Sequence, residues 1–427
     1  MTLTKQEKSW ILYDFANSAY SITITTAILP VFFKTIAAKG LDGPTSTAYW
    51  GYANSISTLL VAIIAPLLGT IADYKFRKKR FFLVFTLVGI ISTALLIFVG
   101  EGNWLTCLII YILTVIGFSG SCVFYDSFIT DVTDNDNMDN ISSLGFAWGY
   151  IGGTIPFIAC ILLIMFAGRI GISTVLATEL SFLITAIWWF IFTLPILKNV
   201  QQVHFIEPEP NYIRNSFKKL WSTFKKVKQN KEIFLFLLAF FFYIDGVHTI
   251  ISMATAFGLD IGMSTNMMMI VLVVLQVVAF PCSMIYGKLA KKFSSGKMIL
   301  FGIITYCIVS IYGVFIKTTL DFWILAILVG SAQGGIQALS RSYFGKLIPK
   351  ENSAEYYGIY NIFGRISSVF GPLLMGIIGS ITNNTRYGVL SLIVLFAIGA
   401  FIFIRLDNHI EKAQSISKNK IIVNPSE

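Results

Sequence analysis

The chain has 427 residues, of which 56% are hydrophobic and only 13% are charged, and its formal net charge is +10. A soluble globular protein of this length needs far more polar surface, so the composition excludes that class and indicates repeated membrane-spanning helices. We therefore attribute the positive charge to basic loops on one side of a membrane, and not to nucleic-acid binding.

Twelve apolar segments are long enough to cross a bilayer as helices, which predicts an all-α membrane protein. The predicted spans are 10–37, 47–72, 81–99, 104–126, 142–167, 173–197, 232–256, 265–287, 298–316, 322–344, 354–380 and 386–405. An even number of spans places both termini on one side. If that side is the cytoplasm, the inner segments hold 26 of the 32 Lys and Arg residues and the outer loops hold five. This bias predicts cytoplasmic termini, although the inner stretch 131–140 ("DVTDNDNMDN") carries only acidic charges.

The first predicted span begins with "WILYDFANSAY" and carries one polar stripe. At helical spacing, the stripe consists of Asp14, Asn17, Ser18, Ser21 and Thr25. Polar groups inside a bilayer must face protein or water, and an ionisable group there is a functional site by default. We interpret Asp14 as the cytoplasmic mouth of a water-lined path. The alternative is a structural role, in which Asp14 is hydrogen-bonded to neighbouring helices and never titrates.

A similar basic loop follows the second span of each half of the chain. "GTIADYKFRKKR" begins at Gly69, and "GKLAKKFSSGK" begins 218 residues later. The same offset relates Gly153 to Gly371, each in a glycine-containing span. Two matching halves predict two six-helix pseudo-repeats, a pattern typical of transporters. The predicted organisation is an N-terminal bundle at 1–197, a linker at 198–231, a C-terminal bundle at 232–406 and a cytoplasmic tail at 407–427.

The linker contains a predicted basic amphipathic helix. Its lysines occupy one face, and the other face is apolar, formed by Ile213, Phe217, Leu220, Trp221, Phe224 and Val227. Such a helix is suited to lying on an anionic membrane surface. A site for a regulatory partner is the alternative.

Ionisable side chains also occur inside spans of the second half. Asp245 lies near the middle of the seventh span, and His248 follows it on the same helix face. Because an imidazole titrates near neutral pH, this pair is a candidate for proton uptake and release; the alternative is a buried structural hydrogen bond. Arg365 lies deep in the eleventh span and cannot lose its charge. It needs either an acidic partner, for which Asp126 and Asp245 are candidates, or an anionic ligand such as a substrate carboxylate.

The tenth span carries Gln333, Gln337 and Arg341 on one helix face. The two glutamines are candidates for hydrogen bonding in a cavity, whereas Arg341 lies close to the inner end and is expected to snorkel or to pair. Small residues allow helices to approach closely. We interpret these residues as packing and hinge sites: Gly149, Gly153, Gly371 and Pro372.

The loop with Gly69, Asp73, Arg77 and Arg80 resembles the loop between the second and third helices in the major facilitator superfamily. The resemblance implies a gating role for these residues, with a departure at Phe76, where the usual pattern has glycine. A narrower resemblance extends over nearly the whole chain in "WILYDFANSAY", "FYDSFITD", "SLGFAWGYIGG", "YIDGVHTI", "GGIQALSRSYF" and "EYYGIYNIFGRISSVFGPLL". These segments resemble the vacuole-effluxer branch, the autophagy-related fungal vacuolar amino-acid effluxers and their bacterial relatives. The resemblance implies the major facilitator fold and transport, and it favours amino acids as the solute.

No GxxxxGK[ST] motif is present, so ATP is not expected to drive transport directly. The five cysteines and three histidines are scattered, and we expect no metal site, no disulfide framework and no cofactor. We predict a secondary active transporter, not an enzyme, that moves a small polar solute by alternating access, with proton coupling as a hypothesis. The expected partners are the solute, protons and membrane lipids, and the expected state is a monomer in the cytoplasmic membrane.

Two other functions remain open at the level of sequence. A flippase for a lipid-like solute can be built on the same fold, and lateral openings between helices would favour it. A membrane-embedded lipid-modifying enzyme would have Asp245 and His248 as its obvious catalytic pair, although the twelve-span repeat argues against an enzyme.

Overall fold

The computed structural model describes residues 3–207 and 212–423, and these residues are almost entirely helical. Within these residues, twelve helical segments are long and apolar enough to cross a membrane. They are Lys5–Ala37, Gly43–Ala72, Lys78–Phe98, Trp104–Val132, Met138–Met165, Thr174–Asn199, Lys231–Ala254, Ile270–Phe293, Ser295–Phe315, Thr319–Leu347, Lys350–Thr382 and Thr385–Ile410. The predicted all-α membrane fold with twelve spans is confirmed.

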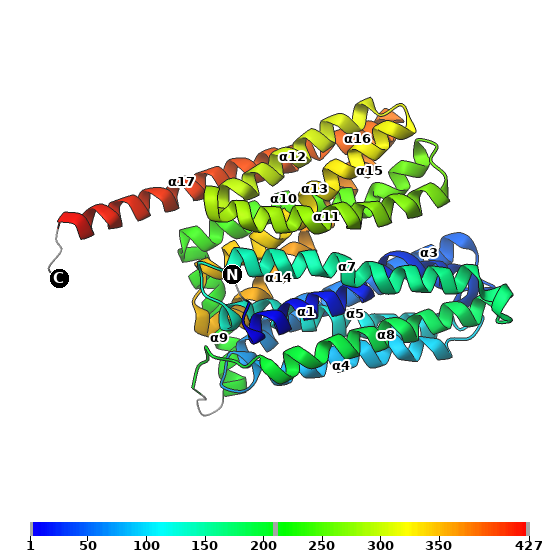
Figure 1. The fold of residues 1–427 in the computed structure, drawn as a ribbon, viewed down its shortest axis with the longest axis horizontal. Helices are drawn as coiled ribbons and strands as arrows, with labels where there is room; N and C mark the ends of the chain where they lie inside the picture. Colours follow the sequence, from blue (N-terminus) through cyan, green and yellow to red (C-terminus); the bar gives the residue numbers. More distant parts are fainter. Residues whose placement is uncertain (1–2, 208–211, 424–427) are drawn as a thin grey trace.

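The helices form two bundles that lie side by side (Figure 1). The first contains α1 (Lys5–Tyr20), α2 (Ile28–Phe32), α3 (Gly43–Ala72), α4 (Lys78–Leu95), α5 (Trp104–Ser127), α6 (Ile129–Val132), α7 (Met138–Met165) and α8 (Thr174–Asn199). The second contains α10 (Lys231–Asp260), α11 (Thr265–Phe293), α12 (Ser295–Phe315), α13 (Thr319–Leu347), α14 (Ser353–Ser367), α15 (Phe370–Thr382), α16 (Thr385–Ser391) and α17 (Ile393–Val423). Between the bundles, α7 packs against α11 and α13, and α14 packs against α3 and α5. Both termini lie at the same end of the molecule, which we call the termini side (Figure 1).

Several helices begin before the apolar runs that predicted them, because capping groups set helix ends. The first helix begins at Lys5 and not at Trp10. The Thr4 hydroxyl accepts the backbone N–H of Glu7 at 3.1 Å, and the Glu7 carboxylate accepts the backbone N–H of Thr4 at 2.8 Å. At the other end of the chain, α17 continues through Val423, so the predicted tail after residue 406 is largely a helical extension.

The first and eleventh spans depart from regular α-helix. In the first span, a π-helical segment at Ser21–Ala27 follows α1, a distortion that is frequent at functional sites. The eleventh span is interrupted between α14 and α15, so that α15 begins anew at Phe370. Pro372 is the third residue of α15, where its missing N–H is tolerated, but it cannot continue an unbroken helix. Interrupted helices of this kind commonly form the binding sites of transporters.

The linker helix α9 (Tyr212–Gln229) packs against α3 and α10. Thr223 and Val227 are buried in this contact, whereas Trp221 is 68% exposed. The predicted apolar face is therefore divided between protein contact and exposure, because the helix packs on its neighbours along only part of that face. The side chains of Ile213 and Phe217 lie outside the described residues.

Candidate functional site

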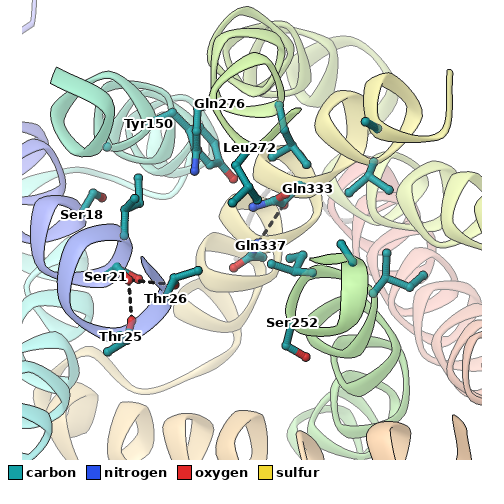
Figure 2. A pocket seen from close by; sticks show the side chains of 18 of the residues that line it. Ser18, Ser21, Thr25, Thr26, Tyr150, Ser252, Leu272, Gln276, Gln333 and Gln337 are labelled. Carbon is teal, nitrogen blue, oxygen red and sulfur yellow. Dashed lines mark hydrogen bonds between the residues drawn. The ribbon is translucent and has the colours of Figure 1, made fainter. Parts of the chain in front are cut away.

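A cavity of 710 Å³ lies between the two bundles. One wall comes from the first span, α5 and α7, and the other comes from α10, α11 and α13. The cavity extends from Arg341, near the termini-side end of α13, to Phe322, near the opposite end of the same helix. Figure 2 shows its polar side chains, which include Ser18, Ser21, Thr25, Thr26, Tyr150, Gln276, Gln333 and Gln337.

The predicted polar stripe of the first span lies on this cavity: Asp14, Asn17, Ser18, Ser21 and Thr25 all line it. The Ser21 carbonyl accepts hydrogen bonds from the hydroxyls of Thr25 and Thr26, the latter at 3.0 Å, where the helix widens into the π-helical segment (Figure 2). Threonine hydroxyls that bond back to a carbonyl of their own helix often bend it, in keeping with the departure from regular α-helix here.

The two predicted glutamines of α13 line the opposite wall. The Gln337 side-chain amide donates to the Gln333 carbonyl at 3.2 Å (Figure 2). Much of the rest of this wall is apolar, formed by Ile250, Leu272, Leu275, Leu325 and Val329. The cavity therefore presents a polar wall on the first span and, on the second bundle, a largely apolar wall with three glutamines, Gln276, Gln333 and Gln337.

A buried ion cluster centred on Arg341 closes the termini-side end of the cavity. Arg341 Nη2 lies 3.1 Å from Asp14 Oδ2, and Nη1 lies 3.1 Å from Asp126 Oδ1. Arg341 Nε donates to the Ser142 hydroxyl at 2.9 Å, and Nη2 donates to the Ser142 carbonyl at 3.1 Å. The Arg341 side chain is 3% exposed. Because Asp14, Asp126 and Ser142 belong to the first bundle and Arg341 to the second, this Arg341 cluster joins the bundles.

Aromatic rings enclose the same guanidinium group. Its carbon lies 4.6 Å from the ring centroid of Trp10, 4.5 Å from that of Phe146 and 5.4 Å from that of Tyr125. Such contacts stabilise a cation whose water shell has been removed. Sequence reasoning expected Arg341 to snorkel or pair but did not include it among the candidate site residues. Its position on the glutamine face of the tenth span was the signal that could have linked it to Asp14.

The predicted gating loop makes a second contact between the bundles. The Asp73 carboxylate accepts the backbone N–H groups of Ala354 at 2.9 Å and Glu355 at 3.0 Å, in the first turn of α14. A carboxylate is favourable at a helix N-terminus. Burial nevertheless raises the pKa of Asp73 from 3.8 to about 7, although Lys78 and these two hydrogen bonds oppose the rise. Gly69 permits this approach, because a Cβ there would lie 2.9 Å from the carbonyl carbon of Ala354.

The basic residues of this loop differ in their surroundings. Arg80 is exposed, whereas Lys78, which sequence reasoning did not single out, is fully buried. Lys78 Nζ lies 2.7 Å from Asp131 Oδ2 and donates to the Ser353 hydroxyl at 2.8 Å. Phe76, at the position where the superfamily pattern has glycine, has φ +63°, a conformation that favours glycine. Arg77 is half-buried at the start of α4.

The acidic stretch 131–140, on the termini side, binds basic and hydroxyl groups of other segments. Asp131 accepts the backbone N–H groups of Val203 and His204 from the linker, at 2.9 and 2.8 Å. Asp139 lies 2.5 Å from Lys346 Nζ and accepts the Ser342 hydroxyl at 2.6 Å. The lack of basic residues in this loop is thus explained by its ion pairs across the termini side.

Asp245 and His248 take different partners. Asp245 Oδ1 accepts the backbone N–H of Gly371 at 3.0 Å, at the start of α15, and its Oδ2 has no hydrogen-bond partner among the described residues. His248 Nδ1 lies 2.9 Å from the Ser368 hydroxyl. Each side chain therefore bonds to the interrupted eleventh span and not to the other member of the candidate pair. His248 lines a smaller pocket beside the cavity, and Asp245 lines neither space.

Arg365 pairs with neither of the two acidic residues proposed as its partners, Asp126 and Asp245. Arg365 Nη2 donates to the Ser119 hydroxyl at 2.5 Å, and Nε is buried without a hydrogen-bond partner. Within residues 3–207 and 212–423, no carboxylate forms an ion pair with Arg365. Asp126 instead pairs with Arg341, and Asp245 binds Gly371.

The glycines interpreted as packing sites lie at close helix contacts. A Cβ at Gly149 would lie 2.8 Å from the Ser18 hydroxyl, and one at Gly153 would lie 2.6 Å from Ile22 Cδ1. A Cβ at Gly371 would lie 2.9 Å from Asp245 Oδ1. The first two glycines therefore let α7 approach the first span, and the third lets α15 approach α10. Pro372 follows the interruption of the eleventh span.

Residues 41–415 match the family model described as "Vacuole effluxer Atg22 like". The MFS-type transporter YxiO of Bacillus subtilis (strain 168), described as uncharacterized, is 52% identical over 402 residues, which cover 93% of this chain and 94% of that protein. Autophagy-related protein 22 of Coccidioides immitis (strain RS) is 23% identical over 454 residues, covering 86% of this chain and 74% of that protein.

Solved structures of major facilitator superfamily transporters share the fold. The proton:xylose symporter XylE superposes with a TM-score of 0.72 at 11% identity, covering 94% of this chain and 95% of that chain. FucP in the outward conformation superposes with a TM-score of 0.71 at 14% identity, covering 94% and 97%. The predicted resemblance to this superfamily and to its vacuole-effluxer branch is confirmed.

Proposed function

The chain belongs to the vacuole effluxer family of major facilitator transporters and is therefore a multi-pass membrane transporter and not an enzyme, and we propose that it moves a small polar solute by alternating access. The observation that carries the mechanism is the cavity between the bundles, closed at the termini side by the Arg341 cluster and the Asp73 contact. The opposite state would have to break these contacts. The transported solute would then leave the cavity on the termini side.

We propose that both termini are cytoplasmic and that the protein works in the cytoplasmic membrane, on the basis of the basic residues that gather on the termini side. In that orientation, the cavity described here would receive solute from the outer side. The direction of net transport would follow the solute and ion gradients, because the same cavity serves both directions.

Amino acids are the first solute class to test. The family is described as vacuole effluxers, and the cavity combines a polar wall with an apolar one, which suits a small molecule with a charged end and an apolar part. A lipid-like solute is the alternative that the apolar wall favours. The polar stripe of the first span, with Asp14, Asn17 and Ser21, and the glutamines Gln333 and Gln337 are the proposed solute contacts.

Proton coupling is proposed at Asp14, Asp126, Asp245 and His248. Asp14 and Asp126 share one guanidinium group that joins the bundles, so adding a proton to either carboxylate would weaken the closed termini side. Asp245 holds the start of α15, so its protonation would alter the interrupted span. Protonation of Asp14 or Asp126 would thus act on the contact between the bundles, and protonation of Asp245 would act on the interrupted eleventh span.

The test is counterflow of a labelled amino-acid panel in proteoliposomes, with and without a pH gradient. Saturable counterflow of one class would support transport of that class, and accumulation driven by the gradient would support proton coupling. Absence of counterflow for every amino acid, in folded protein, would refute amino acids as the solute and favour the lipid-like alternative.

A further inference from the structure

We propose that Arg365 binds the carboxylate of the transported solute in a side pocket of the central cavity. The proposal rests on the proposed transport function, and it adds the chemical group that the solute must carry. The side pocket has a volume of 300 Å³ and shares Asp126, Phe146, Gln337 and Arg341 with the lining of the main cavity. A solute in the main cavity therefore has the side pocket as its immediate neighbour.

Arg365 carries a positive charge inside the protein, where its side chain is half-buried and its Nε atom is buried. A guanidinium group keeps its proton, and withdrawing it from water without a counter-charge is unfavourable. Arg365 has a single side-chain hydrogen bond, to Ser119, and no ion pair with the described carboxylates. The Ser119 hydroxyl that it bonds carries no charge. Arg365 thus has no directly bonded counter-charge among the described residues.

Arg341 and Arg365 line the same pocket but differ in how many of their hydrogen-bond donors are already used. Arg341 also lines it, but its guanidinium group is already bonded to Asp14, Asp126 and Ser142. Arg341 therefore has little capacity for a further anion. Among the described residues, Arg365 bonds to Ser119 through Nη2, so its guanidinium group keeps terminal donors for a carboxylate, which such groups bind in two parallel hydrogen bonds.

The remaining lining restricts the ligand. Asn361 and His248 line the pocket and supply polar groups. Asp126 also lines it, and its Oδ2 lies 3.5 Å from Asn361 Nδ2. A second negative charge on the ligand would meet this carboxylate, so the site fits a monocarboxylate or a zwitterion and disfavours a dicarboxylate.

The position of Arg365 also gives the ligand a mechanical role. Arg365 belongs to α14 of the second bundle, and its hydrogen-bond partner Ser119 belongs to α5 of the first. A carboxylate bound between them would therefore contact both bundles. Arg365 lies in the last turn of α14, directly before the interruption that separates α14 from α15.

The test uses the purified full chain in nanodiscs and titration calorimetry with two matched pairs of probes. The pairs are L-leucine with L-leucinamide, and phenylacetate with phenylacetamide. Wild type is expected to bind at least one acid about tenfold or more tightly than its amide, which corresponds to about 1.4 kcal/mol. Arg365→Gln should abolish that preference, and Arg365→Lys should retain part of it because the charge remains without the paired donors. Arg405→Gln, at an exposed arginine that stacks on Phe401, should leave it unchanged.

Equal binding of acid and amide by wild type, absence of acid binding in folded wild type, or an unchanged preference in Arg365→Gln would overturn the proposal. Counterflow in proteoliposomes separates it from the transport proposal. Acid binding that depends on Arg365 but occurs without counterflow would refute transport and keep the site. Counterflow of a solute without a carboxylate, equal in wild type and Arg365→Gln, would keep transport and refute the site.

Discussion

Replacing Arg341 by glutamine should open the termini side. The substitution removes both ion pairs at 3.1 Å and leaves Asp14 and Asp126 without a counter-charge. The side chains of Arg341, Asp14 and Asp126 are 3%, 13% and 14% exposed. The free energies typical of buried ion pairs therefore apply, and not the smaller ones typical of surface pairs. Removing one partner of a buried pair costs about 3 to 5 kcal/mol.

This cost falls on the closed state, because Arg341 and its two acids belong to different bundles. If the contacts are absent when the termini side opens, the equilibrium should shift toward that state by about 100-fold or more. Spin labels at Asp136 and Lys292 report the change, since both residues are exposed and their neighbours Asn137 and Lys291 are hydrogen-bonded at 2.9 Å across the closed end. Pulsed electron paramagnetic resonance on a cysteine-free background should show a new population at longer distance.

Two further variants separate the ion cluster from simple damage. Combining Arg341→Gln with Asp14→Asn and Asp126→Asn removes the unpaired charges and should restore thermal stability, while the bundles stay less firmly joined. Arg405→Gln should leave the distance distribution as in wild type. Folded Arg341→Gln with a wild-type distance distribution would refute the reasoning that this cluster holds the termini side closed.

Three other predictions concern the gate, the helix contacts and coupling. Because burial raises the pKa of Asp73 from 3.8 to about 7, the folded protein holds a proton that the unfolded chain releases between these values, so thermal stability should fall as pH rises through that window. Asp73→Asn should remove this dependence, and an unchanged pH profile would contradict it. Gly69→Val should shift the same spin-label distances toward the open state, because the valine side chain would meet Ala354. Gly43→Val is the control and should leave the distances unchanged, because no atom lies within 4 Å of its Cβ position. Equal distance distributions in the two variants would count against the contact between Gly69 and Ala354. Asp245→Asn should lose solute accumulation driven by a pH gradient while keeping counterflow. Glu179→Gln on α8 is the control and should behave as wild type. Transport that does not depend on pH in either wild type or Asp245→Asn would exclude proton coupling at Asp245.

The sequence alone was sufficient for the fold and for one wall of the cavity. A bilayer needs about 20 apolar residues per helix, so the apolar runs counted the spans correctly. Polar groups cannot face lipid, so the spacing of Asp14, Asn17 and Ser21 identified the face of the first span that lines the cavity. Both inferences depend only on neighbours along one helix and on the surrounding solvent.

Only the tertiary structure decided which charged groups meet. Asp14 and Arg341 are 327 residues apart, and their contact depends on the rotation and register of two helices in different bundles. Sequence periodicity specifies neither the rotation nor the register. For this reason, Arg341 was not predicted to join the bundles, and Arg365 was given two candidate partners that it does not take. The partners of Asp245 and His248 also depend on packing between helices. Both side chains bond to the interrupted eleventh span, Asp245 to the Gly371 N–H and His248 to the Ser368 hydroxyl. In the sequence, only glycine and proline indicated that this span is irregular. Local chemistry thus fixed which residues are buried, while packing between bundles fixed what each buried charge binds.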